Sequence, residues 1–380
     1  MAPIVLALSR NASLRPLVVV SGQHREMLDQ VNTLFGIVPD HDLDIITSGQ
    51  SLTQVTTRAL AGYSDFFGRT DVSAVVVQGD TTTTVAAAMA AFYHQIPVVH
   101  VEAGLRTGNP RSPYPEEINR RLTTQLTELH LAPTALNRAN LLREGVSATA
   151  IRVTGNTVID AFLDVAGRHE SVGEPTIDAA IRVGRRILLV TAHRRESWGE
   201  VMSGVGRAVA ELARRFPDVL VVLPAHLNPA VRERLLPPLA GLDNVVVTEP
   251  MSYAPFVALI AACTVVLTDS GGLQEEAPSL GKPVLVMRDT TERPEAMHAG
   301  TAALVGTEPR NIVKRVAALL TDAVTYRTMA QATNPYGDGR AAARSIAAIE
   351  ALLSVGTALP GFAEGDASLQ PSNPAVAVGS

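Results

Sequence analysis

The sequence predicts an α/β protein with two Rossmann-like domains whose parallel sheets face a central cleft. Short apolar runs alternate with helical stretches along the chain, as they do when helices cover both faces of a parallel sheet. The alternation runs through two successive series, and 380 residues are too many for one ordinary hydrophobic core. We expect an N-terminal domain over residues 1–170, a C-terminal domain over 171–356, whose last helices can pack back on the first domain, and a disordered tail over 357–380.

The first series contains five apolar runs that are typical of buried parallel strands. They are Leu17–Val20, Ala74–Val77, Val98–Val101, Leu129–Ala132 and Ile151–Val153. Helical stretches lie between them at Thr81–His94, Pro115–Thr127 and Leu136–Glu144. A helix over Ala2–Ser9 precedes the first of these strands, although a domain of this type usually opens with a strand. The domain therefore either begins with that helix or lacks a first strand.

The second series repeats the pattern after a polar stretch near Arg168–Thr176. Its predicted strands are Ile187–Val190, Val219–Leu223, Val245–Val247, Val265–Leu267 and Val284–Val286. Its helices include Val201–Arg215, Ala254–Ala262 and Asn311–Leu320. From about Thr357 the chain is rich in Ala, Gly, Pro and Ser without periodicity, which predicts the disordered tail.

Composition and charge argue against several classes of protein. Hydrophobic residues make up 46% of the chain and charged residues 18%, which is typical of a globular protein. The net charge of −5, without a Lys/Arg cluster, argues against nucleic acid as a partner. Cys263 is the single cysteine, so neither a disulfide framework nor a thiolate metal cluster is expected. No apolar run approaches the roughly 18 residues of a membrane span and no signal peptide opens the chain, so we expect a cytoplasmic protein with no membrane partner.

The segment Asp269–Glu276 predicts a site for a nucleotide diphosphate. An apolar run leads into the turn Ser270–Gly272, and a helical stretch follows. Glycines let the backbone approach a ligand closely, and the free N–H groups of a helix N-terminus point at a phosphate. Glu275 and Glu276 lie about one turn into that helix, where a carboxylate can accept hydrogen bonds from a ribose diol. A Ser-capped helix without a ligand is the alternative.

Three carboxylates of the first half lie where a ligand could meet them. Asp80 and Glu102 each follow a predicted strand, and open α/β sheets bind ligands at the carboxyl ends of their strands. Capping of the next helix by Asp80, and a buried ion pair between Glu102 and Arg106, are the alternatives. Glu116 opens a helix, where an acid also suits the helix dipole.

Basic and imidazole side chains follow strands of the second half. His193 and Arg194 come directly after its first strand, and His226 after its second. They can meet a diphosphate or act as acid and base groups, or they are polar loop residues without such a role. Arg293 lies in the charged loop Arg288–Glu295, a candidate wall for a sugar or phosphate. The chain has no Walker A, HExxH or GxSxG sequence and no GxGxxG after a first strand, so P-loop, zinc-protease, serine-hydrolase and hydride-transfer chemistry lack motif support.

Taken together, these segments resemble the non-hydrolysing UDP-N-acetylglucosamine 2-epimerase family. The resemblance runs from about Met1 to Gly339 and is carried by GQHREMLDQ (Gly22–Gln30), QGDTTTT (Gln78–Thr84), HVEAGLRTG (His100–Gly108), PEEINR (Pro115–Arg120), TGNTVIDA (Thr154–Ala161), HRRES (His193–Ser197), HLNP (His226–Pro229), the long segment Thr268–Ala296 and NPYGDG (Asn334–Gly339). It implies a GT-B architecture, a homodimer, and reversible conversion of UDP-N-acetylglucosamine (UDP-GlcNAc) to UDP-N-acetylmannosamine (UDP-ManNAc) for bacterial surface polysaccharides. It implies no NAD, no metal and no other cofactor.

The resemblance also implies roles for particular residues. Asp80, Glu102 and Glu116 match the family's catalytic carboxylates, and His193 matches a histidine near the diphosphate. The substrate-binding matches comprise the phosphate turn, the ribose ligand and a loop arginine: Ser270, Gly271, Gly272, Glu276 and Arg293. A second, activating UDP-GlcNAc site of bacterial members is matched by Gln23, His24, Arg194 and His226. UDP-GlcNAc is thus expected as substrate and as allosteric activator.

One departure from the family lies at the start of the chain. Family members resemble one another in a first strand and a GTRPEAIK loop just before the residues equivalent to Met1–Pro3, and the sequence lacks that segment. Its arginine and lysine serve the diphosphate and the active site. Either the start was assigned late, at an internal Met, or the chain lacks a central strand and two functional cations. In the second case we expect an inactive or unstable chain, with a non-catalytic UDP-sugar-binding protein as the alternative function.

The resemblance implies a route through a glycal intermediate. UDP leaves C1 of the sugar as the C2 proton is removed, and UDP then re-adds while a proton reaches the other face of C2. This route needs acid/base groups on both faces, stabilisation of positive charge at C1 and a cradle for the diphosphate. A GT-B glycosyltransferase would share the ribose glutamate and phosphate turn but needs an acceptor groove, and a hydrolysing epimerase would release free UDP. The three carboxylates favour epimerisation over glycosyl transfer.

Overall fold

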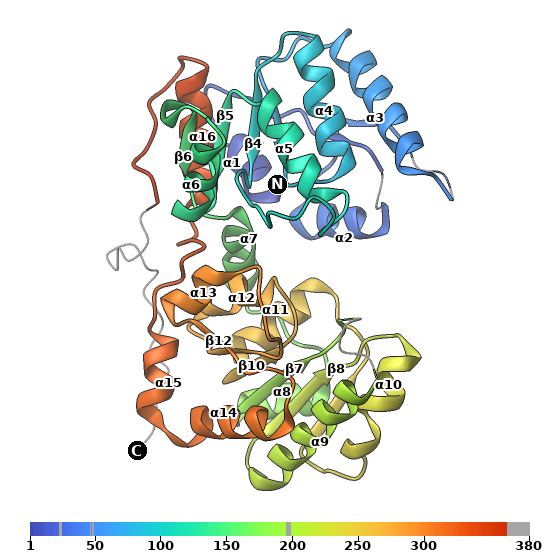
Figure 1. Cartoon of the computed structure of the whole chain (residues 1–380), viewed down its shortest axis with the longest axis vertical. Coiled ribbons are helices and arrows are strands. Elements are labelled where there is room, and N and C mark those ends of the chain that lie inside the picture. The colour runs from blue at the N-terminus through green and yellow to red at the C-terminus, as the bar shows by residue number, and fades with distance from the viewer. Residues whose placement is uncertain (23–24, 46, 48, 195–198, 363–380) are drawn as a thin grey trace. The chain divides into compact units, whose positions relative to one another are not determined.

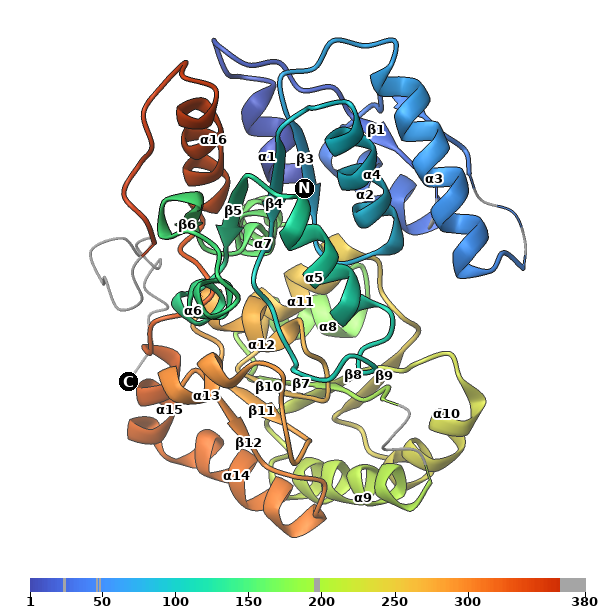
Figure 2. The same ribbon diagram turned by 45° about the horizontal axis from the view of Figure 1, so that its top comes forward.

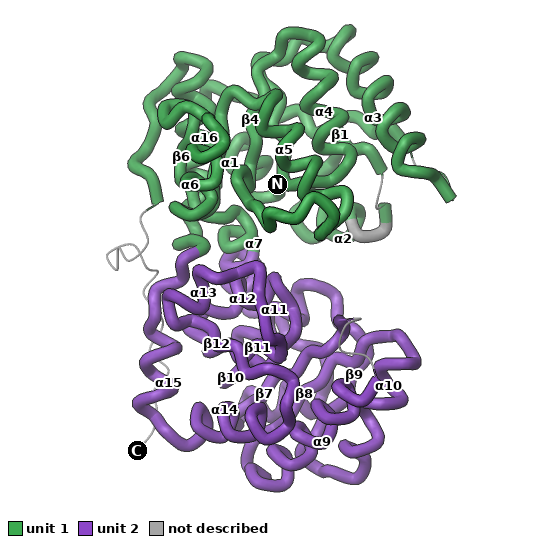
Figure 3. The backbone as a smooth tube through the Cα atoms, viewed as in Figure 1, with its two compact units in different colours: residues 1–161, 336–364 green, residues 162–335, 365–380 purple. Residues whose placement is uncertain are grey.

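The computed structural model describes residues 1–22, 25–45, 47, 49–194 and 199–362 (Figure 1). Parallel sheets and helices alternate along the chain, which divides into two compact units (Figure 3). Unit 1 comprises Met1–Ala161 and Tyr336–Glu364, and unit 2 contains Phe162–Pro335. The chain leaves unit 1 within helix α7 (Thr157–Ala166) and returns before helix α16 (Ala341–Leu352). The predicted α/β class with parallel sheets is confirmed.

Unit 1 contains two parallel sheets. One pairs four strands in chain order: β3 (Val75–Gln78), β4 (Val98–Val101), β5 (Leu129–Ala132) and β6 (Ile151–Val153). The other pairs β1 (Val19–Val20) with β2 (His41–Asp42). The remaining helices are α1 (Ala2–Leu8), α2 (Arg25–Phe35), α3 (Leu52–Phe67), α4 (Thr82–Tyr93), α5 (Glu116–Leu126), α6 (Ala135–Arg143) and the 3-10 turn η1 (Ala148–Ala150). Helix α3 packs along α4 (Figure 2), and α1 packs against α16.

Unit 2 contains one six-stranded parallel sheet in the order β12-β11-β10-β7-β8-β9. Its strands are β7 (Ile187–Thr191), β8 (Leu220–Pro224), β9 (Val245–Thr248), β10 (Val265–Thr268), β11 (Val284–Val286) and β12 (Ala302–Leu304). Its helices are α8 (Pro175–Arg182), α9 (Glu200–Arg215), α10 (Pro229–Leu235), α11 (Tyr253–Ala262), α12 (Leu273–Glu276), α13 (Pro294–Ala299), α14 (Pro309–Thr321) and α15 (Ala323–Ala330), with 3-10 turns η3 (Pro237–Leu239) and η4 (Ala277–Leu280). The strand order reverses between β7 and β10, and ligands of such sheets bind at this switch point.

The core of unit 2 is aliphatic and tightly packed. All the Ile, Val and Leu residues of strands β7, β8 and β10 are buried, and α9 and α14 cover these strands. Gly206 of α9 lies where a Cβ would come within 2.6 Å of the Leu235 carbonyl oxygen. Only glycine therefore allows α9 and α10 to approach this closely. Such packing makes a rigid platform for the loops at the strand ends.

Most predicted strands lie within a residue of their observed bounds, and β4, β5, β6 and β11 match them at both ends. Strand β2 was not predicted, because its two residues are polar and exposed. The predicted N-terminal helix is α1, whose Ile4 is buried. Lack of a first strand stays a prediction. Of the predicted tail, residues 363–380 lie outside the described residues, while Phe362 is buried and its N–H donates to the Val153 carbonyl. None of the described helices is long and apolar enough to cross a membrane.

Candidate functional site

The ends of β3 and β4 bring Gln78 and Glu102 together in unit 1. The Gln78 side-chain amide donates to Glu102 Oε2 at 3.4 Å, and a Cβ on the intervening turn residue Gly79 would lie 3.7 Å from the same oxygen. Glu102 has φ +65°, a left-handed conformation that non-glycine residues rarely adopt. The alternative of a buried ion pair between Glu102 and Arg106 is wrong, because Arg106 pairs with Glu144 at 2.7 Å. A strained acid at a strand end marks a candidate functional residue.

Asp80 is held by two residues of helix α5. Its carboxylate pairs with the Arg120 guanidinium at 2.6 Å, and its backbone carbonyl accepts from the Asn119 side-chain amide at 2.9 Å. The helix-capping alternative is wrong, since Thr81 caps α4 and its hydroxyl accepts an N–H of the first turn. Asp80 is therefore oriented from α5, at the same sheet edge as Glu102.

Adjacent glutamates at the start of α5 have different environments. Glu117 is fully buried and accepts hydrogen bonds from the N–H groups of Thr107 and Gly108 at 3.0 and 3.3 Å. Burial raises the pKa of Glu117, but these hydrogen bonds and the Arg120 guanidinium outweigh burial, so that pKa lies below its usual value. Glu116 is half-buried, and its carboxylate makes no hydrogen bond to any residue that the structure describes. Glu117 thus supports the fold, and Glu116 is available to a ligand.

The switch point of unit 2 holds His193 against Asp269. The His193 Nδ1 lies 2.8 Å from Asp269 Oδ1, and the N–H groups of His193 and Arg194 donate to Asp269 Oδ2 at 2.8 and 2.9 Å. Burial raises the pKa of Asp269, but its three donors outweigh burial and lower that pKa. Asp269 is 1% exposed and the His193 side chain 44% exposed, so a buried carboxylate fixes the orientation of a partly exposed imidazole.

The turn after β10 presents backbone N–H groups. The Ser270 N–H donates to the Thr268 hydroxyl at 2.8 Å, whereas the N–H groups of Gly271 and Gly272 donate to no residue that the structure describes. Gly272 is the residue before α12 and supplies no side-chain cap, so the Ser-capped alternative is wrong. The geometry is that of a turn that can accept an anion.

A charged network borders this turn. Glu292 lies between the guanidinium groups of Arg288 and Arg194, at 2.8 and 3.0 Å. Burial raises the pKa of Glu292, but the Arg288 hydrogen bond outweighs it and lowers that pKa to about 2. A Cβ on Gly271 would lie 3.2 Å from Glu292 and 3.6 Å from Arg194. The glycine therefore lets the turn lie close to a fixed arginine.

The two acids of α12 also differ. Glu275 is buried and forms an ion pair with Arg293. Glu276 is half-buried, and its Oε1 accepts from the Tyr253 hydroxyl at 3.4 Å. Burial, followed by the nearby charge of Glu275, raises the pKa of Glu276 to about 7. A pair of donors such as a ribose diol would favour its ionised form.

The four residues matched to a second site fall in different places. Gln23 and His24 lie outside the described residues. Arg194 belongs to the network beside the phosphate turn, and the His226 ring stacks on His193 with centroids 6.3 Å apart. Arg194 and His226 therefore lie near the switch point of unit 2.

The sequence predicted no individual role for four residues that hold the site together: Asp269, Arg120, Tyr253 and Gln78. Asp269 directly follows a buried strand, the same signal that drew attention to Asp80, and could have been found in that way. Arg120 and Tyr253 are defined by side-chain contacts across elements, which no local pattern reveals.

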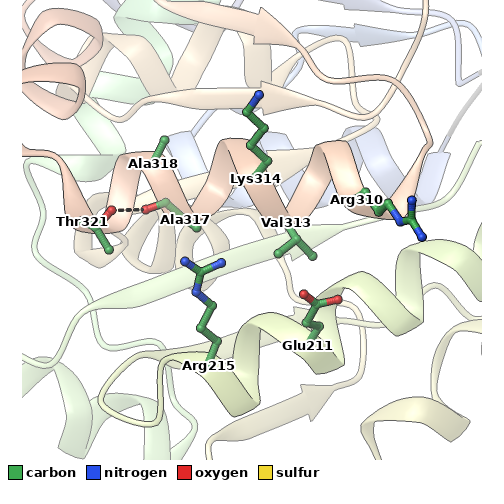
Figure 4. Close-up of a pocket in the computed structure, with 8 residues that line it drawn as sticks. All are labelled: Glu211, Arg215, Arg310, Val313, Lys314, Ala317, Ala318 and Thr321. Carbon is green, nitrogen blue, oxygen red and sulfur yellow. Dashed lines mark hydrogen bonds between the residues drawn. The ribbon is translucent and has the colours of Figure 1, made fainter.

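A surface pocket of about 350 Å³ lies between α9 and α14, away from these residues (Figure 4). Its floor includes Val313 and Ala317, and Arg215, Arg310 and Lys314 surround it with exposed side chains. No buried polar group converges on it, so we place the candidate site at the strand ends. Within the described residues no group of three His, Cys, Asp or Glu side chains could hold a metal ion.

Comparisons with known proteins identify the family of the chain. The family described as UDP-N-acetylglucosamine 2-epimerase matches residues 6–350. The chain is 51% identical over 355 residues to the UDP-N-acetylglucosamine 2-epimerase of Yersinia pestis, which covers 92% of this chain and 94% of that protein. It is 49% identical over 347 residues to the enzyme of the same name from Bacillus subtilis, covering 91% and 90%.

Solved structures give the same result. The crystal structure of UDP-GlcNAc 2-epimerase from Neisseria meningitidis bound to UDP-GlcNAc aligns with a TM-score of 0.79 at 46% identity, covering 93% of this chain and 96% of that one. The complex of S. aureus MnaA with UDP aligns with a TM-score of 0.82 at 40% identity, covering 96% of both chains. Fold and site thus define a nucleotide-sugar enzyme built on two Rossmann-type units. The chain belongs to the UDP-N-acetylglucosamine 2-epimerase family.

Proposed function

We propose that the protein interconverts UDP-GlcNAc and UDP-ManNAc by elimination and re-addition of UDP, without net hydrolysis. The observation that carries the proposal is the grouping of Asp80 and Glu102 at neighbouring strand ends of unit 1, in a chain of this family. Inversion at C2 must remove a proton on one face and return one on the other, which carboxylates can do. The N. meningitidis relative holds UDP-GlcNAc, which supports that nucleotide sugar as the substrate.

The reaction has two balanced steps. In the first, a carboxylate takes the C2 proton, the C–H electron pair forms the C1=C2 double bond, and UDP leaves with the C1–O electron pair. The product is 2-acetamidoglucal. In the second, a β-phosphate oxygen of UDP attacks C1 while a carboxyl group delivers a proton to the opposite face of C2. Only the configuration at C2 changes, so no redox cofactor is needed.

The three carboxylates of unit 1 supply these proton transfers and stabilise positive charge at C1. Glu102 is aimed by its left-handed backbone, and Asp80 by its ion pair with Arg120. The Glu116 carboxylate makes no hydrogen bond to a described residue and can therefore exchange a proton with substrate. When substrate displaces water from the site, each carboxylate charge stabilises the positive charge that develops at C1 more strongly.

Unit 2 binds the UDP part of the substrate. The N–H groups of Gly271 and Gly272, the Ser270 hydroxyl and the His193 imidazole donate to the diphosphate, and Glu276 accepts hydrogen bonds from the ribose hydroxyls. Arg293 fixes the loop beside Glu275 and through it the start of α12. The leaving UDP is stabilised by donors that are already in place.

We also propose a homodimer that a second UDP-GlcNAc molecule activates, with Arg194 and His226 among the residues that bind it. Their position beside His193 supports coupling between such a site and the diphosphate. Light scattering of the purified protein measures its molar mass in solution, which should be twice that of one chain. A rate that rises sigmoidally with UDP-GlcNAc, and hyperbolically in a His226→Ala variant, supports activation; a hyperbolic wild-type curve contradicts it.

The deciding experiment follows the C2 proton. We would incubate the protein with UDP-GlcNAc in D2O and record proton NMR spectra. Loss of the C2 proton signal with appearance of UDP-ManNAc is the expected result. Accumulation of free UDP and ManNAc would instead identify a hydrolysing enzyme, and binding of UDP-GlcNAc by folded protein without exchange would identify a non-catalytic binder.

A further inference from the structure

Two histidines are buried side by side on the strands of unit 1 that lead to Glu102 and its neighbours. His100 lies on β4, two residues before Glu102, and is 0% exposed. His130 lies on β5 and is 2% exposed. The two residues are direct partners in the parallel register of β4 and β5. Fully buried histidines are uncommon, and neither has a role in the proposed reaction.

Among the described residues the His100 side chain makes one hydrogen bond, and its acceptor belongs to the turn that carries Asp80. Its Nε2 lies 2.8 Å from the Gly79 carbonyl oxygen. A carbonyl can only accept, so Nε2 must carry the proton. The Nδ1 of His100 is buried and has no hydrogen-bond partner among the described residues. A proton there would place an unpaired charge in the core, so the neutral Nε2–H tautomer is the form that fits.

Electrostatics favour the same form. Burial lowers the pKa of His100 to about 4, the Gly79 hydrogen bond opposes this shift, and the guanidinium groups of Arg106 and Arg120 add to it. The imidazole is then a neutral donor throughout the neutral pH range. Its function is geometric and does not involve proton transfer.

The Gly79 peptide is tied to β4 from both sides. Its N–H donates to the Val101 carbonyl at 3.1 Å, and its carbonyl accepts from His100. Gly79 has φ +74°, so the direction in which Asp80 leaves β3 is set at this residue. The partner residues on β4 flank Glu102 on its N-terminal side. Both hydrogen bonds therefore couple the turn of Asp80 to the strand of Glu102.

We propose that His100 is a positioning residue, which holds Asp80 in register with Glu102 through the Gly79 carbonyl. The proposal rests on the proposed function, since it assigns a role within that reaction. His130 provides a matched control, because it is a buried histidine on the adjacent strand and its Nδ1 also has no hydrogen-bond partner among the described residues. The polar group beside its imidazole is the backbone of Thr127, which precedes β5 and lies away from the site.

The first test compares side chains at position 100. Glutamine places an N–H near the position of Nε2, whereas leucine fills the space without a donor. We expect His100→Leu to lower kcat about 100-fold, with a much smaller change in KM, because small misplacements of reacting groups have effects of this size. His100→Gln should restore most of the loss. His130→Leu should lower stability but leave kcat within a few-fold of wild type.

Equal kcat losses in the His100→Leu and His130→Leu variants would overturn the proposal, as would a wild-type kcat in folded His100→Leu. If the leucine variant does not fold, His100→Asn replaces it, since asparagine is polar but too short to reach Gly79. An asparagine variant as active as the glutamine variant would then contradict the proposal.

A second readout is independent of turnover. Long-range nitrogen–proton NMR of histidine-labelled protein should identify His100 as the neutral Nε2–H tautomer from pH 8 to pH 5.5, with assignment by the His100→Gln variant. An Nδ1–H tautomer or an imidazolium in this range would overturn the proposal. Correct tautomers in a wild-type protein without C2 exchange would show instead that the proposed function had failed while the hydrogen bond was present.

Discussion

Each unit carries two adjacent glutamates near its strand ends, and the two pairs are arranged alike. In unit 1, Glu117 is buried among backbone and arginine donors, and its neighbour Glu116 is half-buried. In unit 2, Glu275 is buried against Arg293, and its neighbour Glu276 is half-buried. Successive residues of a helix point about 100° apart. One glutamate of each pair can therefore hold the fold while the other meets a ligand.

The two outward glutamates differ in what surrounds them. Glu276 lies near a second acid and a tyrosine hydroxyl, and burial raises its pKa to about 7. The Glu116 carboxylate makes no hydrogen bond to a described residue. Unit 2 thus holds a carboxyl group whose ionisation a bound diol would favour, which suits binding. Unit 1 holds a carboxyl group that no described residue fixes by a hydrogen bond, which suits proton exchange with a substrate.

The largest effect is expected from the pair in unit 1. Glu116→Gln should lower kcat about 1,000-fold, the size of a lost acid/base group, with little change in melting temperature. Glu117→Gln should lower the free energy of unfolding by about 3 kcal/mol, because it removes one partner of a buried ion pair. Turnover per folded molecule should fall far less in this variant. Steady-state kinetics and urea unfolding measure both quantities.

The opposite result would contradict these roles: a Glu116→Gln variant that unfolds and a Glu117→Gln variant that is folded but inactive. Glu117 would then be the proton-transfer group. Arg121→Ala serves as a control on α5, because Arg121 is 44% exposed and contacts Glu117 at 3.3 Å. It should change stability by less than about 1 kcal/mol.

A smaller effect is expected from the pair in unit 2. Glu276→Gln should raise the Kd for UDP about 10-fold, the loss that follows from weakening a hydrogen bond to a charged group. Glu275→Gln should weaken the ion pair with Arg293 and lower the free energy of unfolding, with a smaller change in Kd for UDP. Calorimetric titration measures the Kd of each variant for UDP. Titration with 2′-deoxyuridine diphosphate, which lacks one ribose hydroxyl, measures the contribution of that hydroxyl. Equal affinity of Glu276→Gln and wild type for UDP would exclude Glu276 as the ribose ligand.

These pairs also indicate what could be predicted from the sequence. Buried parallel strands are runs of aliphatic residues, so β4, β5, β6 and β11 were predicted at both ends. The positions of Asp80, Glu102 and His193 follow from the same strands, since each comes just after one. Family resemblance distinguished Glu116 from Glu117 and Glu276 from Glu275, but the physical difference lies in side-chain partners from other elements. Arg120, Arg293 and Tyr253 supply those partners, and their contacts depend on tertiary packing.

The smallest effect concerns pH and tests the environment of Glu276. Its pKa is about 7 in the folded protein and 4.5 in an unfolded chain. Between these values the folded state binds a proton that the unfolded state does not. The free energy of unfolding contributed by Glu276 therefore falls as pH rises from 4.5 to 7. His100 and His130 act in the opposite direction, because burial lowers both pKa values to about 4 from an unfolded value of 6.5.

A variant comparison separates these contributions. Glu276→Gln removes the contribution of Glu276 to the pH dependence of stability. The contributions of both histidines stay unchanged, as does that of Asp160, whose pKa is raised to about 6 by burial. The stability of Glu276→Gln relative to wild type should therefore rise by about 2–3 kcal/mol between pH 5 and pH 8. Urea unfolding at four pH values measures it. Saturating UDP should reduce the difference, because the ribose diol favours the ionised carboxylate. Parallel stability curves for the two proteins would mean that Glu276 ionises as an ordinary exposed acid, and the contrast between the two outward glutamates would then lie in position alone.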